Sequence, residues 1–256
     1  MELCQDSKKV AGLFEGWQES FIYSYLQGCM GECYVDHNEN PKSAQIIIAD
    51  FIFYAGIPDV ELIQNIHRDF CIAVPQTEEW SSLIEEVYGN QAIRQERYAL
   101  LKEKNIFDKN YLEDIVQQLE KPYQLKNIDA NLYDQILSSS YQPFHDLCSQ
   151  FASYEDYLKY SLGVVIVCHG EIVAGASSYI YYQDGIEIEI DTHKDYRHQG
   201  LATICGAKLI LECLDKNLYP SWDAHNQISL ALAEKLGYHF DKSYHVYEII
   251  QSGYKR

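Results

Sequence analysis

Three carboxylates alternate with isoleucines in one short stretch of the chain: Glu187, Glu189 and Asp191, within the run from Ile186 to Thr192. Strict alternation predicts a β-strand, in which every second side chain points to the same face of the sheet. The three carboxylates therefore share one face. Grouping them there costs free energy, because like charges repel and each carboxylate loses water. Either this face binds a cation and takes a proton from it, or it is simply solvated.

A turn follows the strand, from Arg197 to Ala202, and a helix-forming run begins at Leu201. Gly200 has no Cβ, so an anion can approach the backbone closely there. The first N–H groups of a helix have no partners within it, and the helix dipole adds positive charge to them. Arg197 can pair with a phosphate through two hydrogen bonds. We expect an anion-binding turn, although an ordinary strand–turn–helix joint has the same spacing.

The chain is strongly acidic. Its 256 residues include 38 acidic and 20 basic side chains, for a net charge of −18. Nucleic acids and anionic membranes require a basic face, so we exclude both as partners, and a small cationic molecule fits better. A chain of this length can form two domains, each with its own core.

The cysteines and the apolar runs indicate where the protein works. Eight cysteines are scattered among apolar segments, and the chain does not open with a secretory signal. No apolar stretch reaches the roughly 18 residues of a membrane span. We therefore expect a soluble, reduced, cytoplasmic protein.

Cys29, Cys33 and His37 are spaced by four residues, which on a continuous helix would align them as ligands for a soft metal. Gly28 and Gly31 interrupt such a helix, and a fourth ligand is missing nearby in the sequence. We expect buried thiols here and no metal site.

Residue periodicity predicts mixed elements throughout the chain. In the first half we expect helices at 14–27, 78–88 with Thr77 as its cap, 94–104 and 112–119, and strands at 31–36, 45–54 and 70–74. In the second half we expect strands at 123–128, 164–168, 172–182, 186–192, 220–224 and 244–250, and helices at 132–137, 154–162, 201–214 and 227–236.

This order predicts an α/β fold, a mixed sheet with helices on both of its faces. The composition changes at Glu120-Lys121-Pro122. We therefore place a smaller N-terminal α/β domain at residues 1–121 and a second domain at residues 122–256.

A second motif lies downstream of the turn. Asn226-x-x-Ser229 leads to Lys235-Leu236-Gly237-Tyr238, and the turn itself reads Arg197-x-x-Gly200-x-Ala202. Together these motifs resemble the GNAT superfamily of acetyl-CoA-dependent N-acetyltransferases over residues 122–256. The whole chain, with Trp222–Asn226 near its end, resembles a bacterial two-domain subfamily of antibiotic-modifying acetyltransferases such as a zwittermicin resistance protein.

The resemblance implies a site for acetyl-CoA. The edge of the strand would pair with the pantetheine arm, and an N–H near Ile190 or Asp191 would polarise the thioester. The residues implied to bind the cofactor are Ile190, Asp191, Thr192, Arg197, His198, Gln199, Gly200, Leu201, Ala202, Thr203, Asn226 and Ser229.

The resemblance also implies a glutamate base on this strand, since an amine must lose a proton to attack. Glu187 is preferred slightly over Glu189. Many members of the superfamily use a tyrosine as the general acid, and the matching position here is Ala233, so that acid is missing. Tyr244 is a substitute that lies nearby in the sequence.

The expected function is transfer of an acetyl group from acetyl-CoA to a primary amine of a small cationic molecule. A non-catalytic acyl-CoA-binding module is the main alternative. An aminoacyl-tRNA-dependent transferase conflicts with the acidic charge, and a protein N-terminal acetyltransferase would have peptide access narrowed by the extra domain. Whether the N-terminal domain lines the acceptor site or joins two chains in a homodimer stays open.

Overall fold

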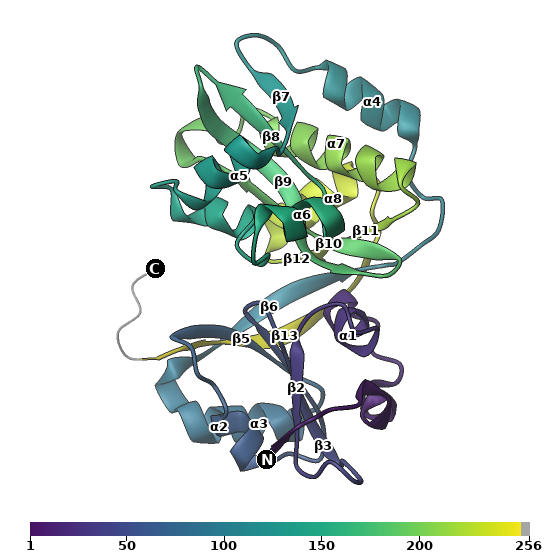
Figure 1. Ribbon diagram of the computed structural model, residues 1–256, viewed down its shortest axis with the longest axis vertical. Helices are drawn as coiled ribbons and strands as arrows, with labels where there is room; N and C mark the ends of the chain where they lie inside the picture. Colours follow the sequence, from purple (N-terminus) through teal and green to yellow (C-terminus); the bar gives the residue numbers. More distant parts are fainter. Residues whose placement is uncertain (252–256) are drawn as a thin grey trace. The chain divides into compact units, whose positions relative to one another are not determined.

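The chain forms two compact units in the computed structural model, which describes residues 1–251 (Figure 1). Unit 1 runs from Met1 to Arg97 and resumes at Ser243, and unit 2 is Tyr98–Lys242. The division therefore lies at residue 97 and not at the expected residue 121. The reason is that two long strands, β6 (Ala92–Leu100) and β13 (Phe240–Ile250), carry the chain into unit 2 and out of it. Residues 252–256 of the expected second domain lie outside the described residues.

Unit 1 contains a mixed sheet. Its order is β1-β2-β3-β4-β5-β13-β6, in which β4 and β5 are parallel and the pairs β2–β3, β3–β4 and β5–β13 are antiparallel. The first five strands are β1 (Glu2–Leu3), β2 (Glu32–Val35), β3 (Ser43–Ile48), β4 (Phe51–Gly56) and β5 (Phe70–Pro75).

Helices flank the sheet of unit 1. Trp80, Ile84, Leu62 and Ile63 pack on it in one buried cluster, and Phe21 packs against Phe51 and Phe53 in another set of contacts. The helices are α1 (Ser20–Leu26), α2 (Val60–Gln64) and α3 (Glu78–Tyr88), with short 3₁₀ helices η1 (Ser7–Lys9), η2 (Ala11–Phe14) and η3 (Gly89–Gln91).

Two predictions in this half were wrong. The apolar run 45–54 is not one strand: it contains the end of β3 and the start of β4, which pair with each other around a turn at Ala49, where φ is +49°. Both strands are buried except at Gly56, the last residue of β4, so no alternation marks the break. Residues 94–104 were expected as a helix but form much of strand β6 instead, because pairing with β13 and β12 overrides the local helix propensity.

Unit 2 is built on a sheet ordered β11-β10-β9-β8-β7. Only β10 and β11 are parallel, and the other neighbours are antiparallel. The strands are β7 (Gln124–Asn127), β8 (Gly163–Cys168), β9 (Glu171–Tyr182), β10 (Gly185–Thr192) and β11 (Tyr219–Ser221), while β12 (Asp223–Ala224) pairs with the end of β6. The expected strand 220–224 is thus two short strands.

The two faces of this sheet are covered by different helices. The long helix α7 (Leu201–Asp215) packs on one face and α4 (Lys109–Gln117) packs on α7 (Figure 1). The opposite face is covered by α5 (Ala130–Leu137), the 3₁₀ helix η4 (Gln142–Leu147) and α6 (Tyr154–Tyr160). The expectation of a mixed α/β fold is confirmed. Within residues 1–251, helices long and apolar enough to cross a membrane are absent.

Gly206 lets helix α7 approach strand β10. A Cβ at this position would lie 2.7 Å from Leu236 Cδ1 and 3.1 Å from Ile190 Cδ1, so there is no room for a branched side chain. The close approach holds the start of α7 next to the end of β10, which positions the turn between them.

The substitution Gly206→Val should lower the free energy of unfolding by about 1–3 kcal/mol, because extra methyl groups overpack this contact. Urea unfolding measures the change. Gly12→Val is the matched control, since a Cβ at Gly12 meets nothing within 4 Å, and its effect should stay within about 0.5 kcal/mol. Equal stability of Gly206→Val and the unchanged chain would show that the contact is not tight.

Candidate active site

Strand β11 parts from β10 halfway along. The two strands pair at Gly185–Tyr219, Ile186–Pro220 and Glu187–Ser221, where β11 ends, while β10 continues to Thr192. On its other edge, β10 stays paired with β9 up to Thr192. One edge of β10 is therefore open to an added strand from Ile188 onward.

The hydrogen-bond register decides which backbone groups point to this edge. His193 N–H donates to Val173 C=O at 2.9 Å, so this opposed pair faces inward between β10 and β9. In an antiparallel pair the direction alternates with every residue. The N–H and C=O groups of Ile190 and Thr192 therefore point to the open edge, and those of Asp191 point to β9. Of the two predicted oxyanion donors, Ile190 is the one that faces the opening.

Glu187 lies where the strands part. It is 5% exposed, and its Oε1 accepts a hydrogen bond from Asp223 N–H at 2.6 Å. This bond links β10 to the segment just after β11, and bonds to a charged acceptor are among the stronger ones. Burial raises the pKa of Tyr219 to about 12, with a smaller contribution from the negative charge of Glu187. Glu187 is thus a buried carboxylate that ties β10 to the start of β12 at the point where β11 ends.

Glu189 and Asp191 lie on the same side of β10 as Glu187. Ile186 and Ile188 are buried against α7, so the carboxylates between and after them point to the face that η4 covers. The expectation that the three carboxylates share one face fits this packing. Glu189 and Asp191 are only half-buried, and they are the more accessible acids of the three.

The turn after β10 has the backbone shape of an anion site. Gly200 has φ +79° and His198 has φ +61°, so two residues of the turn are in the left-handed region. Such conformations turn successive N–H groups toward a common point. Gly200 is also the N-cap of α7, which leaves the first N–H groups of α7 without a side-chain cap. By contrast, Asp129 caps α5 and Asn226 caps α8 (Gln227–Lys235).

Arg197 is held at the mouth of the turn. Its Nε donates to Thr192 C=O at 3.3 Å and its Nη2 donates to Tyr141 Oη at 3.0 Å. Tyr141 Oη also donates to Thr192 C=O at 3.5 Å. On the other side, Tyr123 Oη donates to Gln199 Oε1 at 2.5 Å. The turn is therefore braced by two tyrosines that come from earlier in unit 2.

Several features of the turn fit a bound pyrophosphate. The start of α7 is uncapped, and a Cβ at Gly200 would point into open space, so glycine is needed there for its φ and not for lack of room. Thr192 Oγ1 is buried and has no hydrogen-bond partner among the described residues. Unpaired buried hydroxyls are costly, and a ligand along the open edge of β10 could supply the missing partner.

The second motif lies at the start of α8. Asn226 Oδ1 accepts hydrogen bonds from Ile228 N–H and Ser229 N–H, both at 3.0 Å, and so caps the helix. Only the Nδ2 group of Asn226 is left to donate to a ligand. Asn226 is exposed and Ser229 is half-buried.

Of the positions considered for a general acid, Ala233 and Tyr238 are parts of the core of unit 2. Ala233 is fully buried in the core of unit 2, which explains why a hydroxyl is absent there. Tyr238 Oη donates to Pro220 C=O at 2.6 Å, and burial raises the pKa of Tyr238 well above its ordinary value. Tyr244 lies on β13 within unit 1, whereas Glu187 and Glu189 are in unit 2. Its role as the acid stays a prediction.

Cys33 and His37 lie on different segments of unit 1, a strand and the turn after it. Groups of three or more histidine, cysteine, aspartate or glutamate side chains placed to hold a metal are absent from residues 1–251. Cys33 is buried in β2, and burial raises its pKa to about 12. His37 is exposed on the turn that follows.

Sequence reasoning missed Tyr141 and Tyr123. Each lies more than fifty residues before the turn that it contacts, and the chain has 22 tyrosines, so no local pattern singles them out. Only the packing of η4 against β10, and of the segment before β7 against the turn, brings them there.

Asp191 should make stability depend on pH. Burial raises the pKa of its carboxyl above 3.8, although Thr192 N–H and the charge of Arg197 oppose the rise. The folded chain then binds this proton more tightly than the unfolded chain, so the carboxyl lowers stability as pH rises from the unfolded pKa through the folded one. Asp191→Asn should therefore raise the melting temperature relative to the unchanged chain, by an amount that grows as the pH rises above 3.8 through the raised pKa of the folded carboxyl. The exposed Asp184→Asn is the control, and a parallel profile for both variants would contradict the assignment.

Comparisons with known proteins identify the family of the chain. The model of the GNAT acetyltransferase family matches residues 11–247, which include most of both units. An uncharacterized N-acetyltransferase of Bacillus subtilis (strain 168), YdfB, is 26% identical over 248 residues, with 89% of each chain covered.

Solved structures show the same relationship. A GCN5-related N-acetyltransferase-like protein from Streptococcus suis 89/1591 is 45% identical, with a TM-score of 0.91 over 95% of this chain and 98% of that one. A tandem GNAT protein from the clavulanic acid biosynthesis pathway shares the fold, with a TM-score of 0.58 at 10% identity over 98% of this chain and 96% of that one. With its family model matched over both units and its strand edge open beside an uncapped helix, the chain belongs to the GNAT acetyltransferase family.

Proposed function

We propose that the protein transfers the acetyl group of acetyl-CoA to a primary amine of a small cationic molecule. The observation that carries the proposal is the open edge of β10 next to the uncapped start of α7. An extended arm fits a strand edge and a pyrophosphate fits a helix N-terminus. Acetyl-CoA, when bound, supplies an activated acyl group.

The residues of the turn would hold the phosphates. The N–H groups from His198 to Thr203 would meet the pyrophosphate at the left-handed turn, and Arg197, positioned by Tyr141, would pair with it. Thr192 Oγ1 and the backbone of Ile190 would meet the arm along the edge. Asn226 would donate to the cofactor through Nδ2, with Ser229 next to it in the first turn of α8.

Ile190 N–H would stabilise negative charge on the acyl oxygen, because it points to the open edge and is fixed by the sheet. The acceptor amine must lose a proton to attack. We assign that proton to Glu189, since Glu187 is buried with one oxygen on Asp223 N–H. Glu187 then positions the parted strands. Both carboxylates also favour a cationic acceptor, as does the net charge of −18.

Charge alone selects the acceptor, so the proposal names a class of cationic amines and not one molecule. Antibiotics that carry amines, including the aminopolyol class of the zwittermicin resistance resemblance, are acceptors of the right charge. One observation favours the alternative, a non-catalytic acyl-CoA-binding module. Ala233 is buried at the position where many members of the superfamily carry a tyrosine as general acid.

Acetyl-CoA at a hundredfold excess over its dissociation constant should stabilise the fold by about 2.7 kcal/mol. Gly200→Glu should abolish this gain, because a carboxylate in the turn repels the phosphates. The positive φ at residue 200 also strains the glutamate backbone by about 1 kcal/mol. Differential scanning fluorimetry measures both. Gly28→Glu is the matched control: its φ of +72° and its open Cβ position resemble those of Gly200, but it lies in unit 1. If acetyl-CoA raises the melting temperature of Gly200→Glu as much as that of the unchanged chain, the cofactor binds elsewhere.

Glu189→Gln should lower kcat by about 10²–10⁴-fold and remove the acidic limb of the pH–rate profile, because it deletes the proton acceptor. Thiol release from acetyl-CoA, screened over polyamines, aminoglycosides and aminopolyols, provides the assay. Glu187→Gln keeps a side-chain oxygen that can accept the hydrogen bond from Asp223 N–H. The pH–rate profile of this variant should therefore retain its acidic limb. The reverse result would move the base to Glu187. If no amine causes thiol release while acetyl-CoA still binds, the result would favour a non-catalytic acyl-CoA-binding module.

A further inference from the structure

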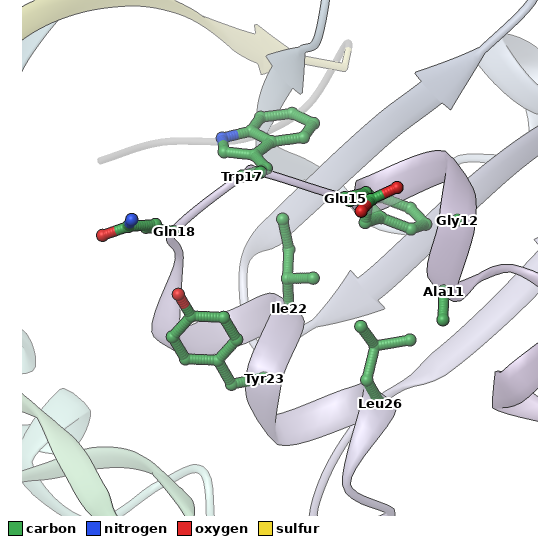
Figure 2. A pocket seen from close by; sticks show the side chains of 10 residues that line it. Ala11, Gly12, Glu15, Trp17, Gln18, Ile22, Tyr23 and Leu26 are labelled. Atoms are coloured by element: carbon green, nitrogen blue, oxygen red, sulfur yellow. The ribbon is translucent and has the colours of Figure 1, made fainter.

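Unit 1 has a groove of its own on the surface formed by η2 and α1. Its volume is about 500 Å³, within the range of small-molecule sites. Figure 2 shows Trp17 above Ile22 and Tyr23 to its lower left, with Leu26 below and Ala11 on the right. Nothing in the proposed transfer reaction requires this groove.

The walls of the groove are firmly held. The Trp17 ring stacks on Phe14 with centroids 6.2 Å apart, and it meets Phe53 edge-on at 5.6 Å. Phe14 and Ile22 are buried, so the floor belongs to the core of unit 1. Trp17 and Tyr23 are only half-buried. A partly exposed indole and phenol are typical of binding sites, because aromatic rings recognise ligands at little entropic cost.

The charge around the groove is negative. Of the described residues that line it, Glu15 is the only one with an ionisable carboxyl, and lysine, arginine and histidine do not contribute. Glu19 adds a second negative charge nearby: the pKa of Tyr23 is raised by burial first and by the charge of Glu19 next. An anionic ligand would therefore be repelled, while a cation gains from both the rings and the carboxylates.

We infer that this groove binds a small organic cation with an apolar body, an alkyl or aryl ammonium. The apolar body lies against Ile22 and Leu26, and the ammonium lies beside the Trp17 ring within reach of Glu15. Charge complementarity selects this occupant over a neutral or acidic one. The inference goes beyond the proposed function, because it concerns unit 1 and needs no acetyl-CoA.

Three probes of one shape test the inference: 2-phenylethylammonium, 2-phenylethanol and phenylacetate. Isothermal titration of the full chain without acetyl-CoA should show the ammonium binding roughly tenfold more tightly than the alcohol, and phenylacetate not at all. Tryptophan emission reports the same event, since Trp80 is fully buried and Trp222 nearly so. Equal affinity for the ammonium and the alcohol would overturn the inference.

Two variants locate the site. Glu15→Gln should reduce the preference for the ammonium and leave the alcohol unchanged, whereas Glu39→Gln, an exposed glutamate away from the groove, should match the unchanged chain. Trp17→Phe keeps a ring against Phe14 and Phe53, so it preserves the fold while removing the emission change. An ammonium preference unaltered by Glu15→Gln would place the cation elsewhere. A dimer in sedimentation that Trp17→Phe dissociates would assign the groove to a second copy of the chain.

Discussion

The parting of β11 from β10 is the constraint on which the rest of unit 2 depends. A strand edge inside a sheet must have its N–H and C=O groups satisfied, yet β10 loses its neighbour after Glu187. The bond from Asp223 N–H to Glu187 Oε1 holds the departing segment at that point. A buried carboxylate is costly unless it is paired in this way. The fold thus keeps a hydrogen-bonded carboxylate in its interior beside a strand edge that β11 does not pair with.

The turn and helix that follow use this edge. Gly206 brings α7 against Ile190, and the left-handed residues His198 and Gly200 turn the chain from β10 into the helix. Because Gly200 occupies the N-cap, the first amides of α7 remain for an anion. Arg197 is fixed by bonds to Thr192 and Tyr141, so the positive charge at the mouth does not depend on the ligand to order it.

Each of the two units carries acidic side chains at its own candidate binding surface. In unit 2, Glu189 and Asp191 face away from α7, while the basic side chains of the turn lie past the end of the strand. Donor and acceptor sites of opposite charge can therefore exist a few residues apart. In unit 1, carboxylates accompany exposed aromatic rings around the groove at Trp17. Both arrangements favour cationic molecules, which agrees with a net charge of −18.

The sequence by itself determined the elements around the turn, from the strand 186–192 to the helix 201–214, because alternation, a glycine and a helical period are all local signals. It also determined the family motifs at Arg197–Ala202 and Asn226–Tyr238. It failed at 45–54 and 94–104, where strands buried on both faces or paired over long distances carry no local period. Tertiary structure alone decided which backbone groups of β10 face the opening, that Glu187 anchors Asp223, and that Tyr141 and Tyr123 brace the turn. Register and long-range contacts set these features, and neither can be read from neighbouring residues in the chain.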